Sequence, residues 1–175
     1  MKKFFFILVL FSSTIAMSLS ASPLIPFKMG VVFPNYDNAY LVVNSGAYIP
    51  LQDNLEFSIA GAFGIRTETT SYNNVNAYFY IPIDLGVTFL FPIPANFTII
   101  SGVGLSSQFL FDDNFYYHLG PYLKVGMRYR LHPNMQLSLE AKQDLTFGPS
   151  EWINTSTQIS AGIVFNFDST DETID

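Results

Sequence analysis

The chain has 175 residues, no cysteine and a formal net charge of −6 at pH 7, and it contains no internal repeat of solenoid length. This length accommodates one domain, and without cysteine neither a disulfide scaffold nor a lipid-modified N-terminal cysteine is available. The sequence also has no nucleotide-binding glycine motif and no basic nucleic-acid patch, and its two histidines lie far apart, so we expect no nucleic-acid partner, no metal site and no cofactor.

The first 21 residues are typical of a cleaved signal peptide. Lys2 and Lys3 form a basic start, an apolar run follows from Phe4 to Phe11, and small residues gather near position 20. We expect cleavage between residues 18 and 22. The apolar run is shorter than the roughly 20 residues of a spanning helix, although a retained membrane anchor is the alternative. Without Lys2 and Lys3, six basic residues face fourteen acidic ones, a net charge of −8.

Eight segments with period-two alternation follow the signal peptide. In the clearest, Leu55 to Arg66, every odd position except Gly61 is a large apolar residue, and the even positions are small or polar. Successive side chains of a strand point to opposite faces, so this period predicts strands with one apolar face. No odd-numbered strand position is charged. The predicted strands are 27–34, 39–49, 55–66, 78–91, 97–111, 117–131, 135–147 and 157–167.

The connections between these strands differ in length at the two ends. Short turns are expected at 50–54, 92–96 and 132–134, and they alternate with mostly longer, polar connections at 35–38, 67–77, 112–116 and 148–156. This layout is typical of a barrel in the bacterial outer membrane whose N-terminus lies in the periplasm. The longer connections are then expected to face the cell exterior.

The composition of the two faces indicates which one meets lipid. The even face is rich in Gly, Ala and Ser, which suits the narrow interior of an eight-stranded barrel. A soluble barrel such as a lipocalin also alternates, but it turns its apolar residues inward and covers its outside with charge. We therefore predict an all-β, eight-stranded antiparallel up-and-down transmembrane β-barrel over residues 27–167. Aromatic residues on the odd face predict two girdles: Phe27, Phe57, Phe89, Phe91, Phe97, Tyr129, Phe165 and Phe167 near the short turns, and Phe33, Phe63, Phe79, Phe109, Phe111, Tyr117 and Phe147 near the other end.

Charged residues on the even face are expected to meet inside the barrel. If the chain turns at Pro133 to Met135, Arg128 lies opposite Glu140 and Lys124 opposite Asp144, whereas a shift of two residues makes them diagonal neighbours. We interpret the group as structural ion pairs, with acid–base catalysis as the alternative. The predicted lumen charge cluster comprises Asp84, Lys124, Arg128, Glu140, Lys142 and Asp144.

Other polar groups offer few routes to chemistry. His118 is expected to face inward at the outer rim as a hydrogen-bonding residue, and His132 falls in a short turn. A diffuse divalent-ion site at the loop carboxylates Asp112 and Asp113 is a further alternative.

The last strand carries the most specific local pattern. A polar residue at 160 precedes Gly162, and the aromatic residues Phe165 and Phe167 follow at alternate positions. With the strand count, this resembles the small eight-stranded outer-membrane barrels of the OmpA/OmpX-like group. The resemblance implies that these residues are the signal read by the barrel-assembly machinery. Such chains usually stop at the terminal aromatic residue, whereas here an acidic tail, 168–175, continues and is expected to be disordered in the periplasm.

Members of that group serve as anchors, adhesion or host-contact proteins, envelope stabilisers and lipid-modifying enzymes. We expect a monomeric, non-enzymatic surface protein surrounded by outer-membrane lipid, with loops 67–77 and 148–156 as its contact sites. Tyr72 and Trp152 are the candidate contact residues, although Trp152 could instead be an interfacial anchor.

An enzyme of the lipid A deacylase kind is the alternative, and it requires a serine and a histidine that face lipid together. His118 is expected to face inward, and the outward Ser107 has no histidine on its side. A narrow pore is the third possibility, which a side-chain-filled lumen disfavours.

Overall fold

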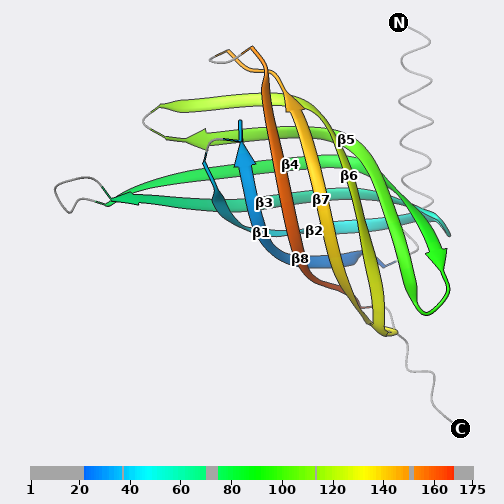
Figure 1. Cartoon of the computed structure of the whole chain (residues 1–175). Helices are drawn as coiled ribbons and strands as arrows, with labels where there is room; N and C mark the ends of the chain where they lie inside the picture. The colour runs from blue at the N-terminus through cyan, green and yellow to red at the C-terminus, as the bar shows by residue number, and fades with distance from the viewer. Residues whose placement is uncertain (1–21, 37, 70–74, 113, 150–151, 168–175) are drawn as a thin grey trace, which may run out of the picture.

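The computed structural model describes residues 22–36, 38–69, 75–112, 114–149 and 152–167. These residues form eight antiparallel strands that close into one barrel in chain order, with β1 paired to β8 (Figure 1). No helix in these ranges is long and apolar enough to cross a membrane. The strands are β1 (Leu24–Pro34), β2 (Tyr40–Gln52), β3 (Leu55–Thr69), β4 (Val75–Ile93), β5 (Phe97–Phe111), β6 (Phe115–His132), β7 (Met135–Thr146) and β8 (Asn154–Asn166).

Residues of equal parity pair with one another all the way around the barrel. The exceptions are two bulges beside short turns, between Pro50 and Gln52 and between Arg130 and His132. Because side chains alternate along each strand, equal-parity pairing keeps every odd residue on one continuous surface. This is why the sequence pattern kept the same phase over so long a stretch.

The odd surface is the outside of the barrel. In β6, Leu123 is 63% exposed while its neighbours Tyr122 and Lys124 are 3% and 7% exposed. All described buried hydrophobic residues have even numbers, and all exposed large hydrophobic residues within the strands have odd numbers. The barrel is therefore apolar outside and mixed inside, which confirms the predicted face assignment.

Tyrosines fill much of the interior, and glycines make room for them. Tyr40 and Tyr80 pack with Val32 and Val42 in the half of the barrel near the longer connections. Lower in the barrel, the Tyr122 ring lies over two glycines of β4 and β5. A Cβ atom on Gly86 would lie 2.2 Å from Tyr122 Oη, and one on Gly104 would lie 2.6 Å from its Cε1 atom. The Tyr122 ring can therefore lie against the barrel wall only because Gly86 and Gly104 have no side chain.

The connections follow the predicted asymmetry, with several boundaries corrected. The three turns at one end leave only residues 53–54, 94–96 and 133–134 outside the strands. Ala95 and Asn96 adopt left-handed φ angles of 66° and 65°, which permit so tight a reversal. At the other end, much of the predicted 67–77 loop is strand, because Thr67 pairs with Ala77 and Thr69 with Val75.

The β3–β4 hairpin consequently projects beyond its neighbours (Figure 1). On the β2 side the last pair is Leu41 with Ile65, and on the β5 side it is Phe111 with Phe79. Strand β8 likewise begins at Asn154 and not at Thr157. The longer end of the barrel is therefore more ordered by strand pairing than the sequence indicated.

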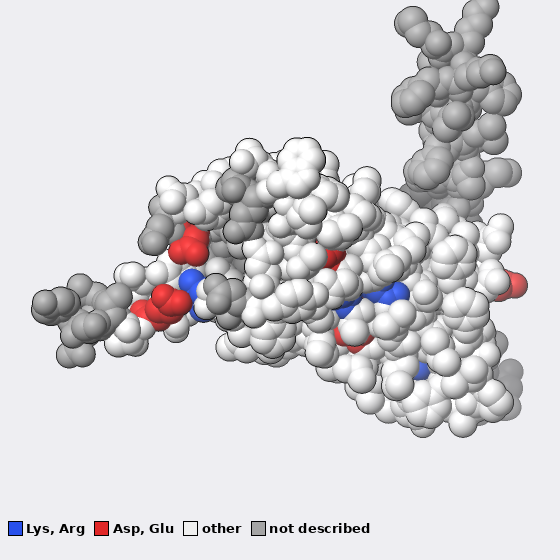
Figure 2. Space-filling model, turned by 45° about the horizontal axis from the view of Figure 1, so that its top comes forward, with Lys and Arg blue, Asp and Glu red and all other residues white. Residues whose placement is uncertain are grey.

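The outer surface carries little charge. The face in Figure 2 is mostly uncharged, with acidic and basic atoms gathered at the end of the β3–β4 hairpin and a few visible between uncharged atoms near the middle. Aromatic rings pack together near both ends. Phe97 contacts Tyr129 at a centroid distance of 4.7 Å near the short turns, and Phe109 contacts Tyr117 at 5.2 Å near the longer connections.

Candidate functional site: the barrel interior and the loop end

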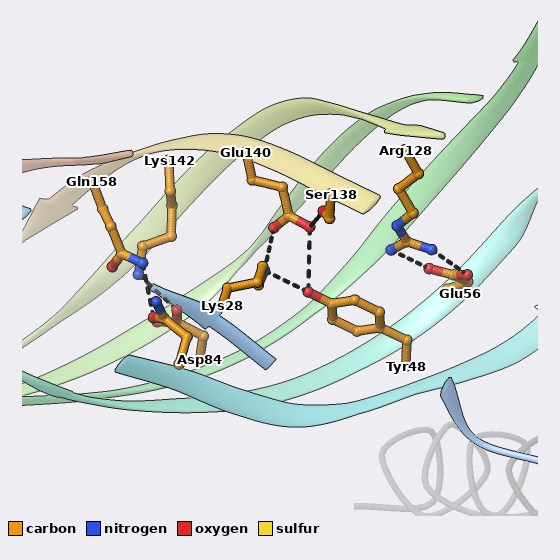
Figure 3. Close-up of polar contacts among 10 residues, drawn as sticks. Lys28, Tyr48, Glu56, Asp84, Arg128, Ser138, Glu140, Lys142 and Gln158 are labelled. Atoms are coloured by element: carbon orange, nitrogen blue, oxygen red, sulfur yellow. Dashed lines mark hydrogen bonds and ion pairs between the residues drawn. The ribbon is translucent and has the colours of Figure 1, made fainter. Parts of the chain in front are cut away.

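Two groups of polar side chains bridge the interior of the barrel (Figure 3). We call the first the Tyr48 cluster, and it consists of Lys28, Tyr48, Glu56, Lys124, Arg128, Ser138 and Glu140. The second is the Lys142 cluster, which consists of Asp84, Gln108, Lys142, Asp144 and Ser156. In each cluster some contacts join strands that are not neighbours, such as β3 with β6 and β4 with β7, so these contacts cross the lumen.

In the Tyr48 cluster, one ammonium group joins three strands. Lys28 Nζ donates hydrogen bonds to Tyr48 Oη at 2.7 Å and to Glu140 Oε2 at 2.7 Å. The other Glu140 oxygen accepts a hydrogen bond from Ser138 Oγ at 2.9 Å. The Lys28–Glu140 ion pair is buried, with side-chain exposures of 7% and 6%, so water screens it little.

A second ion pair in this cluster spans the barrel from β6 to β3. The Arg128 guanidinium binds Glu56 in a bidentate manner, with both N–O distances at 2.8 Å. This fork geometry is the strongest arrangement that a carboxylate and a guanidinium can form. The guanidinium also lies 4.6 Å from the centroid of the Tyr48 ring, and Lys124 Nζ lies 5.0 Å from the same centroid.

The Lys142 cluster is held by one lysine and two carboxylates. Lys142 Nζ lies 2.6 Å from Asp84 Oδ2 and 3.2 Å from Asp144 Oδ1. Asp144 also accepts a hydrogen bond from Ser156 Oγ at 2.9 Å, and Gln108 Nε2 donates to that serine at 3.2 Å. This chain of contacts links β4, β5, β7 and β8.

The structure places all six predicted cluster residues inside the barrel but pairs them differently. The β6–β7 turn is two residues long and is preceded by the bulge between Arg130 and His132, so the strands pair in the alternative register, shifted by two residues, in which Arg128 and Glu140 are diagonal neighbours. Arg128 binds Glu56, and Lys124 joins none of the ion pairs found among the described residues. The cross-strand partners are Arg128 with Ser138, Gly126 with Glu140, Lys124 with Lys142 and Tyr122 with Asp144.

Sequence reasoning missed two charged members of the network, Lys28 and Glu56. Both occupy even positions, Lys28 near the middle of β1 and Glu56 near the start of β3, so parity alone placed them on the inner face. Their partners lie two and three strands away around the barrel, and local register cannot reveal such contacts. Considering the charged even-numbered residues of all strands, and not only those of the β6–β7 hairpin, could have identified both residues.

The arrangement of these groups favours structure over catalysis. Their carboxylates are paired with bases or hydroxyl groups, and buried charges are stable in a wall only when they are paired in this way. His118 is 2% exposed inside the barrel, and Ser107 lies on the outer face, so the two do not meet. Within the described ranges, no group of three or more acidic or histidine side chains is placed to hold a metal ion.

The loop end carries exposed apolar residues and mixed charges. Trp152 is 82% exposed between β7 and β8, and Val75 is 65% exposed at the start of β4. Arg66 pairs with Glu68 at 3.2 Å and with Asp112 at 3.8 Å. Tyr72 and Asp113 lie outside the described residues.

The predicted assembly signal occupies the end of β8. Gly162 lies between Lys28 of β1 and Ser138 of β7. Phe165 stacks on Phe167 with centroids 6.2 Å apart, and Phe167 is 74% exposed just after the strand ends. The predicted signal peptide, 1–21, and the acidic tail, 168–175, lie outside the described residues.

No family model matches the chain, and no curated protein sequence matches it. Several solved structures do. Neisserial surface protein A aligns with a TM-score of 0.67 at 14% identity, covering 83% of this chain and 96% of that one. Ail, the attachment invasion locus protein of Yersinia pestis, solved with the heparin analogue sucrose octasulfate, gives 0.53 at 13% identity, covering 84% and 97%. The outer membrane protein AlkL, solved in lipid bilayers, gives 0.52 at 13% identity, covering 84% and 90%.

These likenesses concern the fold, and they agree with the inside-out distribution of side chains. The chain is an eight-stranded antiparallel transmembrane β-barrel with the architecture of the small bacterial outer-membrane barrels. The predicted fold class is confirmed.

Proposed function

We propose that this chain is a monomeric, non-enzymatic outer-membrane protein that acts through its exposed loop end, as a contact or adhesion protein on the cell surface. The observation that carries the proposal is the network of buried ion pairs across the interior. A lumen that is bridged by paired side chains leaves little free reactive chemistry inside. Recognition then falls to the loop end, as is usual for loops on a rigid scaffold.

The outer surface supports placement in a lipid bilayer. Apolar residues cover the odd face, and aromatic pairs near both ends fit the two girdles that contact the membrane interfaces. Export by the signal peptide and recognition of Gly162, Phe165 and Phe167 by the barrel-assembly machinery complete this proposal.

The composition of the loop end favours a partner with an apolar and neutral or basic surface. Tyr36, Phe115 and Trp152 are 61%, 59% and 82% exposed there. The longer connections of the sequence are acidic, and Arg66 is already engaged by two carboxylates. Ail was solved with a heparin analogue, whereas this acidic loop end disfavours such polyanions.

The orientation can be tested directly because the chain has no cysteine. We expect Val75→Cys to react with a membrane-impermeant maleimide on intact cells, and Ala95→Cys to react only after lysis. The two positions are matched, since both are exposed at opposite ends of the barrel, Val75 at the start of β4 and Ala95 in the β4–β5 turn. Labelling of Ala95→Cys alone on intact cells would invert the proposed topology and remove the loop end from the cell surface.

The functional class needs two further measurements. With the protein expressed, cell adhesion to epithelial or abiotic surfaces should rise and should fall in the Trp152→Ser variant, while the lipid A mass profile stays unchanged. Purified protein in planar bilayers should show no stable open conductance. A changed lipid A profile would favour the enzyme alternative, and steady conductance would favour a pore.

A further inference from the structure

A polar pocket opens at the short-turn end of the barrel, away from the proposed contact surface. It has a volume of about 340 Å³ and lies between the β4–β5 turn and strands β5, β6 and β7. Asn96, Thr98, Arg128, Arg130 and Gln136 give it its polar lining, and Pro92, Ile93 and Ala95 complete its wall. Among the residues that the structure describes, no carboxylate lines it.

The pocket carries an excess of positive charge. Arg130 is exposed and forms none of the ion pairs found among the described residues. Arg128 lies deeper, with its side chain 3% exposed, and its two terminal nitrogens bind Glu56. The Arg128 Nε–H group is buried without a hydrogen-bond partner in the described part of the chain. A buried donor of this kind is costly unless an acceptor reaches it.

The described turns near the pocket supply no carboxylate that could bind its arginines. Asp53 is the acidic residue of the described turns at this end, and it belongs to the β2–β3 turn, which does not line the pocket. An anionic group must therefore come from elsewhere.

The chain itself brings such a group to the pocket. Asn166 N donates a hydrogen bond to Asn134 O at 2.9 Å, so the end of β8 lies beside the β6–β7 turn (Figure 1). Gln136 of the pocket is paired with Arg130 on one side and with Val164 of β8 on the other. Two strand spacings, about 10 Å, thus separate Arg130 from β8.

The sequence after β8 can cover this distance. Segment 168–175 contains Asp168, Asp171, Glu172 and Asp175 and no basic residue. Strand β8 holds the chain as far as Asn166, and at about 3.3 Å per residue the five residues from Asn166 to Asp171 extend up to about 16 Å. The carboxylates from Asp171 onward are therefore within reach of Arg130.

We propose that the acidic segment 168–175 docks in this pocket, with its carboxylates bound to Arg130 and to the free Nε–H of Arg128. A short tether gives a local concentration in the millimolar range, so even a pocket of ~1 mM affinity is occupied for much of the time. This inference does not depend on the proposed role of the loop end.

A single spin label tests the docking on the whole folded chain. Ser169→Cys introduces the sole cysteine, and a nitroxide there should show a motionally restricted component. Arg130→Gln should reduce that component several-fold, Arg130→Lys should retain most of it, and 1 M salt should weaken it because exposed charges are then screened. Arg66→Gln, which removes a partly exposed guanidinium at the other end, is the matched control and should change nothing. A heat-modifiability gel verifies that each variant folds.

Inorganic phosphate distinguishes the segment from an external anion. We expect phosphate to release the label in the full chain and to stabilise the barrel only after residues 168–175 are removed. Equal label mobility in the parent and in Arg130→Gln would overturn the proposal. So would phosphate binding that is identical with and without the segment, because the pocket would then serve a free anion.

Discussion

The ion pair between Glu56 and Arg128 should be worth far more to stability than any pair at the barrel surface. The Glu56→Gln variant keeps the shape of the side chain but removes its charge, which leaves the Arg128 guanidinium buried without its bidentate partner. Their side chains are 2% and 3% exposed, so water cannot replace the lost contact. Breaking a buried pair by removing one partner costs about 3–5 kcal/mol.

The chain offers a matched control in the pair between Arg66 and Glu68. Its N–O distance is 3.2 Å, but the Glu68 side chain is 48% exposed. Such pairs contribute about 0–1 kcal/mol, so Glu68→Gln should have little effect on the free energy of unfolding. The expected difference between the two variants is therefore at least about 2 kcal/mol.

Reversible urea unfolding in lipid vesicles, followed by circular dichroism and by gel mobility, measures both variants on one scale. A double variant, Glu56→Leu with Arg128→Met, should recover most of the loss, because apolar groups of similar size can replace a buried pair. Free energies of unfolding of Glu56→Gln and Glu68→Gln that agree within about 1 kcal/mol would show that the buried pair contributes no more than the exposed one.

Three further perturbations test the wall and its assembly. Val125→Arg places a charge on the lipid face at a cost of ~2–4 kcal/mol and should impair assembly in a heat-modifiability gel, while Lys124→Arg should assemble normally; equal assembly would refute the face assignment. Gly86→Ala should destabilise the barrel by about 1–3 kcal/mol in urea titrations, since its Cβ would meet a buried ring, whereas Gly61→Ala on the outer face should be nearly neutral. Phe167→Ala should slow insertion in an in vitro assembly assay, whereas removal of the acidic tail should not; the reverse ranking would contradict the proposed assembly signal.

Strand number and the direction of each side chain could be predicted because both depend on alternation alone. The odd residues around Val125 could be assigned to the lipid face and the even residues around Lys124 to the lumen without knowing their contacts. Alternation and the presence of lipid on one side were sufficient. The strand ends were less accessible. Thr67 to Thr69 and Val75 to Ala77 are polar or small enough to suggest a loop, yet pairing with each other keeps them in a hairpin.

The contacts within the lumen could not be predicted because they depend on the shear of the closed barrel. Pairing of Glu56 with Arg128 requires knowing how far β3 is displaced relative to β6, and period two carries no such information. The register of β6 and β7 was similarly open, since the two-residue turn and the bulge beside it together displaced the pairing by two positions.

The equal-parity pairing of the strands bears on how such a protein can change over time. Insertion or deletion of one residue inside a strand would exchange lipid-facing and lumen-facing side chains from that point to the next connection. Length variation is therefore tolerated in pairs of residues or in the outer loops, and the apolar residues that face lipid can exchange with one another at little cost. A wall specified by a two-letter pattern can take the same shape in chains of very different sequence, as the TM-score of 0.67 at 14% identity illustrates.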